Sequence, residues 1–281
     1  MAIPSHKCLC RDIVTTRQRP ADTMPELTEI YRFPVKGLGP EPLDTVELAA
    51  GRTLPFDRHW AIENGPGPFD PEHPAHVKKK HFLMLAGQAE LARVRCRYDT
   101  AGHSLRIEVD GQDSGPVRLD DPAKHDLLLF APLQSLLGEA VRGRLRIVHA
   151  PGQAMTDIPE PHISLINAAS VRDLSARTGV SLDPLRFRGN LLIDGLAPWA
   201  EFDWVGRTIR IGDAVLTARS RIGRCAATSV DLVTGVRDID VPKALFEHFG
   251  HTQCGLYLSV ETGGPIRRGD RVLLDAHAPT P

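Results

Sequence analysis

The sequence predicts a mainly β protein with a few helices, in an α+β arrangement. Short alternating or apolar segments separated by Gly and Pro recur along most of its 281 residues, whereas a helical spacing of apolar residues appears in only a few windows. Two similar segments, 208–217 and 265–274, each hold a Gly-Asp turn between β-rich runs. Strands joined by such turns can close a small barrel, which removes exposed sheet edges.

The first half of the chain contains most of the expected short strands. Alternation or β-rich composition predicts strands at 27–31, 46–48, 60–62, 85–99, 104–109 and 145–149. The stretch 64–74 carries four prolines and two glycines, so we expect a loop there, either a lid over a pocket or a solvated connection. One amphipathic helix is expected over 132–142, with Pro132 in its first turn and Gly143 as its stop.

The second half begins at a junction around 155–161. A strand is expected at 163–166, followed by a helix that Asn167 caps and Gly179 ends. A short buried strand follows at 191–193, ahead of the two segments with Gly-Asp turns.

Composition excludes several classes of protein. A hydrophobic content of 42%, a charged content of 25% and a net charge of −1 are typical of an ordinary globular protein and give no footprint for nucleic acid or a membrane surface. No apolar run is long enough to cross a bilayer. Five scattered cysteines indicate a reducing compartment, and we expect a cytoplasmic protein. Residues 1–23 are expected to form a poorly ordered leader.

The strongest candidate for a reactive or metal-binding residue is Cys225. It follows Gly223 and Arg224 and has Arg219 and Arg221 close upstream. Nearby positive charge favours a thiolate, so Cys225 is a candidate nucleophile or soft-metal ligand. The alternative is a small buried hydrophobe whose packing explains it.

A second candidate group lies near the start of the chain. Lys36 and Gly37 fall in a turn, where glycine lets a ligand approach the backbone, and Arg58 lies between the expected strands at 46–48 and 60–62. Lys and Arg that converge on one point suit a phosphate, although both are by default solvated surface charges.

Two histidine-containing groups could indicate metal, but each lacks a full ligand set. One comprises His73, His76 and His81, and the other His248, His251 and Cys254. The sequence also lacks a G-x-S-x-G elbow, a Rossmann or Walker glycine motif and a CxxC pair. One soft ligand among several anion-binding groups therefore favours a bulky phosphorylated metal cofactor.

An ordered series of short motifs spans roughly residues 27–274. They are found at 34–37, 57–60, 188–190, 199–206, 209–213, 224–231, 255–257 and 266–270. This series resembles the MOSC family in its two-part form, the arrangement of amidoxime-reducing components and their bacterial relatives. The resemblance implies an N-terminal β-barrel domain over 24–152 followed by a MOSC-type β-barrel domain over 153–276.

The resemblance also implies a site. Cys225 would be both the catalytic residue and the protein ligand of molybdenum in a molybdopterin cofactor, with Lys36, Gly37 and Arg58 at its phosphate. The remaining cofactor-binding positions would be Arg188, Asn190, Arg224, Tyr257 and, in place of a hydroxyl, His162. Relatives often carry Ser at the position of Gly37, and Ser or Cys at that of Gly223. Pyridoxal phosphate is not expected, because no domain for it fits in the chain.

The implied activity is two-electron reduction of an N-hydroxylated small molecule. Because the chain shows no electron-transfer module, a separate ferredoxin- or reductase-type donor protein is implied. The first alternative is a carrier of molybdenum cofactor or sulfur without turnover of its own. The second is a β-barrel protein that has lost its cofactor, a reading favoured by the glycines at 37 and 223.

Overall fold

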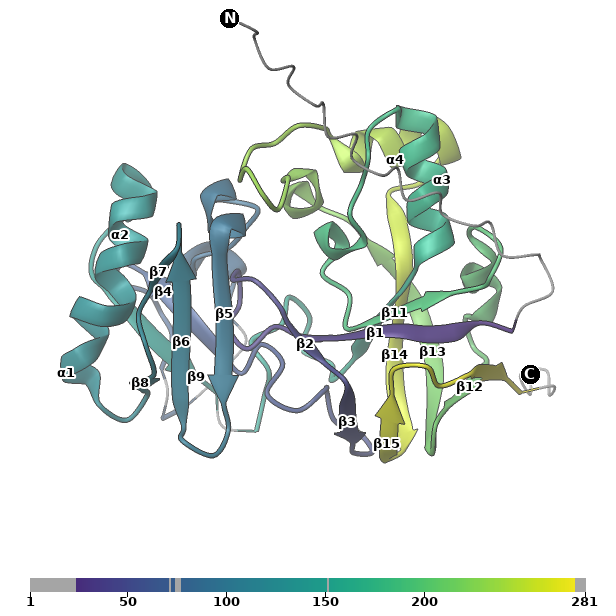
Figure 1. Cartoon of the computed structure of the whole chain (residues 1–281), viewed down its shortest axis with the longest axis horizontal. Helices are drawn as coiled ribbons and strands as arrows, with labels where there is room; N and C mark the ends of the chain where they lie inside the picture. The colour runs from purple at the N-terminus through teal and green to yellow at the C-terminus, as the bar shows by residue number, and fades with distance from the viewer. Residues whose placement is uncertain (1–23, 71, 74–76, 151, 276–281) are drawn as a thin grey trace, which may run out of the picture.

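The computed structural model describes residues 24–70, 72–73, 77–150 and 152–275 (Figure 1). The leader expected over residues 1–23 lies outside the described residues. Strands dominate, which confirms the mainly β class with a few helices. They are Glu26–Arg32 (β1), Glu41–Leu43 (β2), Thr45–Leu48 (β3), Trp60–Asn64 (β4), Val94–Asp99 (β5), Ser104–Val109 (β6), Gln112–Asp113 (β7), Val117–Arg118 (β8), Leu145–His149 (β9), Ile163–Asn167 (β10), Leu191–Asp194 (β11), Thr208–Ile211 (β12), Ala214–Gly223 (β13), Gln253–Thr262 (β14), Gly264–Arg267 (β15) and Val272–Leu274 (β16).

The α-helices of the described chain are short. They are Pro122–Lys124 (α1), Ala131–Leu137 (α2), Ala168–Thr178 (α3) and Val241–Phe249 (α4), and a π-helical segment, His125–Phe130, joins α1 to α2. No helix among the described residues is long and apolar enough to cross a membrane.

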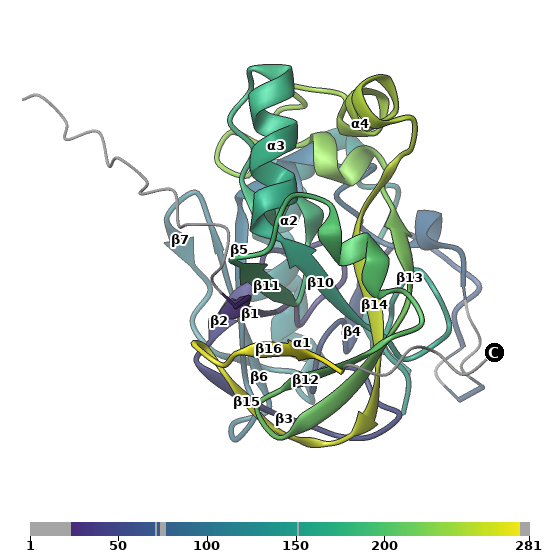
Figure 2. The ribbon, with the colours of Figure 1, turned by 90° about the vertical axis from the view of Figure 1, so that its right-hand side faces the viewer.

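An eight-stranded sheet organises the right-hand part of Figure 1. Its strand order is β16-β12-β13-β14-β10-β11-β1-β2, with β10 and β11 parallel and the other neighbours antiparallel. Apolar side chains of these strands form one core, and α3 and α4 pack over a second apolar cluster at one end of the sheet (Figure 2). Asn167 ends β10 and caps α3, because its side chain accepts a hydrogen bond from Ala169 N at 3.0 Å.

The left-hand part of Figure 1 holds β4–β9, α1 and α2 around a separate apolar core. Strand β5 pairs with β6, which also pairs with β7 and β8, and β4 pairs with β9. On β5 every second residue is buried, as in a strand with one face on a core.

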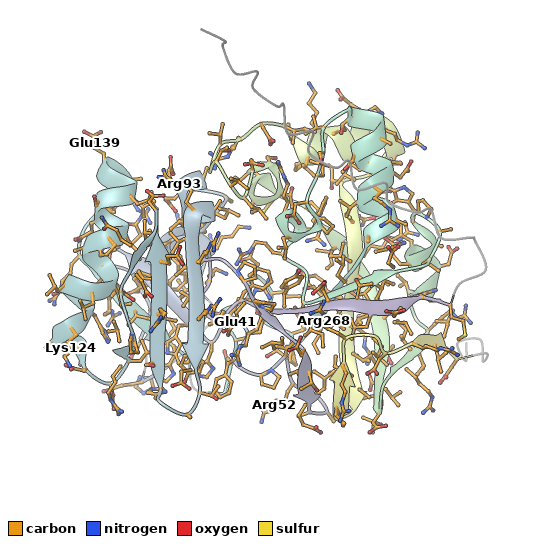
Figure 3. The ribbon with its side chains drawn as sticks, in the orientation of Figure 1. Glu41, Arg52, Arg93, Lys124, Glu139 and Arg268 are labelled. Atoms are coloured by element: carbon orange, nitrogen blue, oxygen red, sulfur yellow. The ribbon has the colours of Figure 1, made fainter. Side chains whose placement is uncertain are left out.

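Strands from the start of the chain belong to the right-hand part. β1 pairs antiparallel with β11, with Ile30 opposite Leu191, and β3 pairs with β15, with Val46 opposite Ile266. A buried carboxylate, that of Glu41 (labelled in Figure 3), links this region to β5. Glu41 accepts from Arg32 Nε at 2.5 Å and from Tyr98 N at 3.2 Å. The chain therefore crosses between the two parts more than once, and a division at residue 152 stays a prediction.

Most expected elements are present, and three differ. Residues 89–93 form a 3-10 helix rather than the start of a strand, so only 94–99 are extended. Helix α2 ends at Gly138, where φ is +52°, and not at Gly143. The segment 265–274 is not a hairpin, because β15 pairs with β3 whereas β16 pairs with β12.

Gly255 marks a close approach between β14 and β10. Its φ is +79°, and a Cβ there would lie 2.4 Å from Leu165 O. Gly206 has a similar φ of +84° but no atom within 4 Å of a Cβ, so it isolates the conformational cost. We expect G206A to lower the free energy of unfolding by about 1–2 kcal/mol and G255A by about 2–5 kcal/mol. Chemical denaturation monitored by circular dichroism measures both, and equal losses would contradict the steric argument.

Candidate functional site

One pocket lies where loops of the two parts meet. Lys79 and Asp157 line this pocket. So do all nine residues singled out from the sequence, which are Lys36, Gly37, Arg58, His162, Arg188, Asn190, Arg224, Cys225 and Tyr257. Six cationic side chains line the pocket against three acidic ones, so the pocket is cationic overall. A cleft lined by charges of one sign attracts ions of the opposite sign more strongly than an isolated surface charge does. The functions of these nine residues remain predictions.

Lys36 lies at the inner end of the pocket. Its side chain is only 9% exposed, and its Nζ donates to Met155 O at 2.9 Å and to Asp157 Oδ1 at 2.5 Å. Burial lowers the pKa of Lys36 and the charge of Asp157 acts against that shift. Lys36 is therefore held beside a carboxylate and not extended into solvent.

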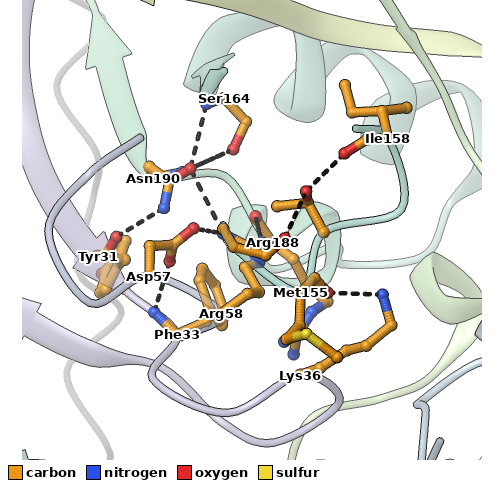
Figure 4. A network of polar contacts seen from close by, with 12 residues as sticks. Tyr31, Phe33, Lys36, Asp57, Arg58, Met155, Ile158, Ser164, Arg188 and Asn190 are labelled. Carbon is orange, nitrogen blue, oxygen red and sulfur yellow. Dashed lines mark hydrogen bonds and ion pairs between the residues drawn. The ribbon is translucent and has the colours of Figure 1, made fainter. Parts of the chain in front are cut away.

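Arg58 and Arg188 both contact one aromatic ring, that of Phe33. Their guanidinium carbons are 4.4 and 4.3 Å from the centroid of Phe33, within range of cation–π attraction. Arg58 also donates to Arg188 O at 2.8 Å and pairs with Asp57, whose other oxygen accepts from Phe33 N at 2.8 Å (Figure 4). This network fixes the guanidinium of Arg58, and the guanidinium of Arg188 is held separately by donation to Leu38 O at 2.8 Å.

Arg188 and Arg224 are partly buried cations. Burial lowers the pKa of Arg188 to about 9, and the charge of Arg58 adds to this effect. Burial also lowers the pKa of Arg224, whose guanidinium donates to Phe187 O at 2.8 Å and to the carbonyl of Cys254. Poorly solvated cations gain the most from an added anion, so this wall suits an anionic ligand.

Asn190 follows the helical turn that carries Arg188. Its Oδ1 accepts from Ser164 Oγ at 2.7 Å and Ser164 N at 3.1 Å, and its Nδ2 donates to Tyr31 O at 3.2 Å. These bonds join β10 to β1 behind the pocket (Figure 4). Both ends of the amide are thus engaged with the protein.

Cys225 directs its sulfur to the pocket and is the exposed thiol among the described cysteines. It precedes the 3-10 turn Ala226–Ser229, and its carbonyl accepts from Thr228 N at 3.0 Å. The upstream arginines do not surround it as expected: Arg219 pairs with Glu261 and Arg221 stacks on Phe202. Neither arginine is among the residues that line the pocket.

His162 and Tyr257 lie at the rim. Their ring centroids are 5.5 Å apart, and burial raises the pKa of the Tyr257 hydroxyl.

Two glycines that depart from the family pattern have different surroundings. At Gly37 φ is +86° and a Cβ would lie 2.6 Å from Leu83 O, so the local backbone excludes a larger residue. At Gly223 no atom lies within 4 Å of a Cβ, so a side chain would fit there. The glycine at 37 is thus matched to its neighbours.

Two pocket residues were missed from the sequence. Lys79 places its Nζ 4.0 Å from Cys225 Sγ and 2.9 Å from Asp157 Oδ2. The run Lys78–Lys80 was visible, but nothing distinguished its middle member, and Asp157 stands in a junction without any motif. Only the folded chain brings them to the sulfur.

The two histidine groups do not form metal sites within the described residues, where no cluster of three or more suitable side chains occurs. His76 lies outside the described residues. His248 is on α4, whereas Cys254 is fully buried on β14 rather than in a loop.

Comparison with known proteins agrees with this fold. The family model for the MOSC domain matches residues 152–273, and that for the MOSC N-terminal beta barrel domain matches residues 24–134. The chain belongs to the MOSC family. Its MOSC-type β-barrel domain therefore follows an N-terminal β-barrel domain, as the sequence predicted.

Curated relatives of the chain carry two kinds of name. It is 34% identical over 275 residues to a molybdenum cofactor sulfurase of Anopheles gambiae. This alignment covers 84% of the present chain and 34% of the relative. It is 30% identical over 122 residues to mitochondrial amidoxime-reducing component 1 of Mus musculus. That alignment covers 39% of the present chain and 35% of the relative. The chain thus spans about a third of the length of these relatives.

A solved structure of the YuaD protein from Bacillus subtilis aligns with 91% of this chain and 98% of its own, at 13% identity and a TM-score of 0.45.

The exposure of the sulfur can be tested directly. Iodoacetamide added to the native protein should modify Cys225 and leave Cys96 and Cys254 unmodified, because burial shields both thiols and raises the pKa of Cys254 to about 12. Peptide mass spectrometry assigns each modified residue. Full modification of all three thiols after denaturation is the control, and a Cys225 that resists native modification would contradict the geometry.

Proposed function

We propose that the protein is a molybdenum-cofactor-binding oxidoreductase that reduces N-hydroxylated compounds with electrons from a separate donor protein. The observation that carries this proposal is the exposed Cys225 sulfur in a cationic pocket built from both parts of the chain. Family membership and relatives named for amidoxime reduction support it.

The residues of the pocket fit such a cofactor. A thiolate is a donor that soft transition metals prefer, and the described pocket offers one exposed sulfur. Buried guanidinium groups and Lys36 supply the positive charge that a phosphorylated pterin requires. The donor set therefore suits a metal held at the rim and a phosphate held deeper inside.

Each residue then has a definite role. Lys36 and Arg58 would hold the phosphate with the Gly37 backbone, Arg188 and Arg224 would hold the pterin, and Cys225 would be the metal ligand. Asn190 would keep the wall in register through its bonds to Ser164 and Tyr31. His162 and Tyr257 would border the opening where a small-molecule substrate enters.

The bound cofactor would supply the two-electron chemistry. Conversion of an N-hydroxylated compound to the parent amine or amidine and water consumes two electrons and two protons. Lys79 offers a proton at Nζ, 4.0 Å from the sulfur. The electrons would come from a ferredoxin- or reductase-type partner, and pyridoxal phosphate has no part in the scheme.

We expect C225A to lose both bound molybdenum and reductase activity, because it removes the thiolate ligand. C96A is the matched control, since Cys96 is a buried thiol on β5 that does not line the pocket. The measurements are the molybdenum-to-protein ratio by metal analysis, pterin fluorescence after oxidation, and reduction of an amidoxime with an artificial electron donor. An active, metal-loaded C225A would refute the ligand assignment.

The same assay separates enzyme from carrier. A wild-type protein that holds molybdenum and pterin but reduces neither an amidoxime nor a hydroxylamine would contradict the reductase proposal and favour a carrier of the cofactor.

A further inference from the structure

Asp157 bridges two lysines that line the cationic pocket. One carboxylate oxygen accepts from Lys36 Nζ at 2.5 Å and the other from Lys79 Nζ at 2.9 Å. The two lysines lie far apart in the sequence, one after β1 and the other in the 3-10 turn Lys79–His81. An ammonium on each side of one anion is also the arrangement that binds phosphate or sulfate.

The two ends of this arrangement differ in their access to solvent. The Lys36 side chain is 9% exposed and stays anchored through its bond to Met155 O. The Asp157 and Lys79 side chains are 47% and 40% exposed, so both face the opening. The lysines thus form a fixed inner point and a movable outer one, with the carboxylate between them.

The backbone next to Asp157 is held by its own hydrogen bonds, whereas within the described chain the Asp157 side chain is held by the two lysines alone. Met155 N donates to Arg58 O at 2.6 Å, and Thr156 Oγ1 donates to Ile158 O at 2.6 Å. Beyond its two lysine partners the Asp157 carboxylate has no further partner recorded in the described residues. Rotation of this one side chain toward solvent would therefore free both ammonium groups without moving a strand.

We propose that Asp157 is an exchangeable internal counter-anion: it neutralises Lys36 and Lys79 in the ligand-free protein, and an incoming oxyanion of the phosphate type displaces it. The inference rests on the proposed function only for the identity of that oxyanion as the phosphate of a cofactor. A phosphate dianion outcompetes a carboxylate because it carries more charge and more acceptor oxygens. The buried Lys36 thereby keeps an anionic partner in both states.

The test uses the full-length chain, produced in cells that cannot make the pterin, and titrates it with inorganic phosphate in a calorimeter at constant ionic strength. D157N keeps the shape of the side chain and removes its charge, so phosphate should bind about tenfold more tightly than to wild type. K79Q should weaken the binding, because it removes one of the two ammonium groups.

E160Q is the matched control. Glu160 lines the same pocket, and no ion pair to either lysine is recorded for it, so its removal changes the charge of the opening without releasing the lysines. We expect E160Q to change the affinity less than about twofold. Unfolding curves confirm that each variant is folded, and D157S is a second variant with the same expected direction.

The results distinguish a displaceable Asp157 from an Asp157 that positions the two lysines. If Asp157 instead holds the lysines in place, D157N and D157S bind phosphate no better than wild type, and the inference is overturned. The same holds if no variant binds phosphate at millimolar concentration, or if E160Q matches D157N. Binding that is detected only after Asp157 is neutralised supports exchange.

A second measurement needs no phosphate. Anionic iodoacetate and neutral iodoacetamide both alkylate Cys225. The rate with iodoacetate divided by the rate with iodoacetamide reports the local charge near Sγ, because positive charge attracts only the anionic reagent. D157N should raise this ratio severalfold, whereas E160Q should barely change it. An unchanged ratio in D157N contradicts the inference. Neither measurement involves molybdenum or reductase activity. A failure of the proposed function would therefore leave these results intact, and a failure of this inference would leave the proposed function untouched.

Discussion

Pairing between the first strand of the structure and a strand from the second half fixes the geometry of the site. β1 lies antiparallel to β11, and each is followed or preceded directly by a loop that enters the pocket. Lys36 comes shortly after β1, and Asn190 immediately precedes β11. Since backbone hydrogen bonds set the register of the two strands, they also set how far the lysine lies from the arginine of the opposite loop.

Buried positive charge is the second constraint. Arg188, Arg224 and Lys36 all have a pKa lowered first by burial, so the cationic forms of these side chains are destabilised by desolvation. The protein offsets this cost with carbonyl oxygens, the ring of Phe33 and the carboxylates of Asp57 and Asp157. An anionic ligand would serve the same purpose, and for that reason the wall indicates what the pocket binds more clearly than its shape does.

The sequence predicted local features well and long-range ones poorly. Asn167 and Gly179 marked the ends of α3, because capping depends on residues within a few positions. The 3-10 helix at 89–93 was missed because its apolar residues also fit a strand, and only packing against α2 decides between the two. The partner of β15 could not be known, since β3 lies near the opposite end of the chain.

The candidate site shows the same division. The nine residues were found because short motifs carried a family resemblance, and folding places all of them around one pocket. Arg219 and Arg221, chosen only for closeness in sequence to Cys225, have other partners. Cys225 lies beyond the end of β13, and the pairing of β13 with β14 shifts register twice between Ala218 and Gly223, so sequence spacing did not fix where these side chains point. Lys79 and Asp157 had no motif, and their importance arises entirely from tertiary contact with each other.

The edges contributed by β1 and β3 also bear on how the protein is made. Both segments are synthesised before their pairing partners, because β11 and β15 follow them much later in the sequence. Until then their unpaired backbone groups and apolar side chains stay open to wrong partners. The pocket can therefore form only after β11 has been synthesised, and a chaperone that shelters β1 until then would protect the segment that leads into Lys36.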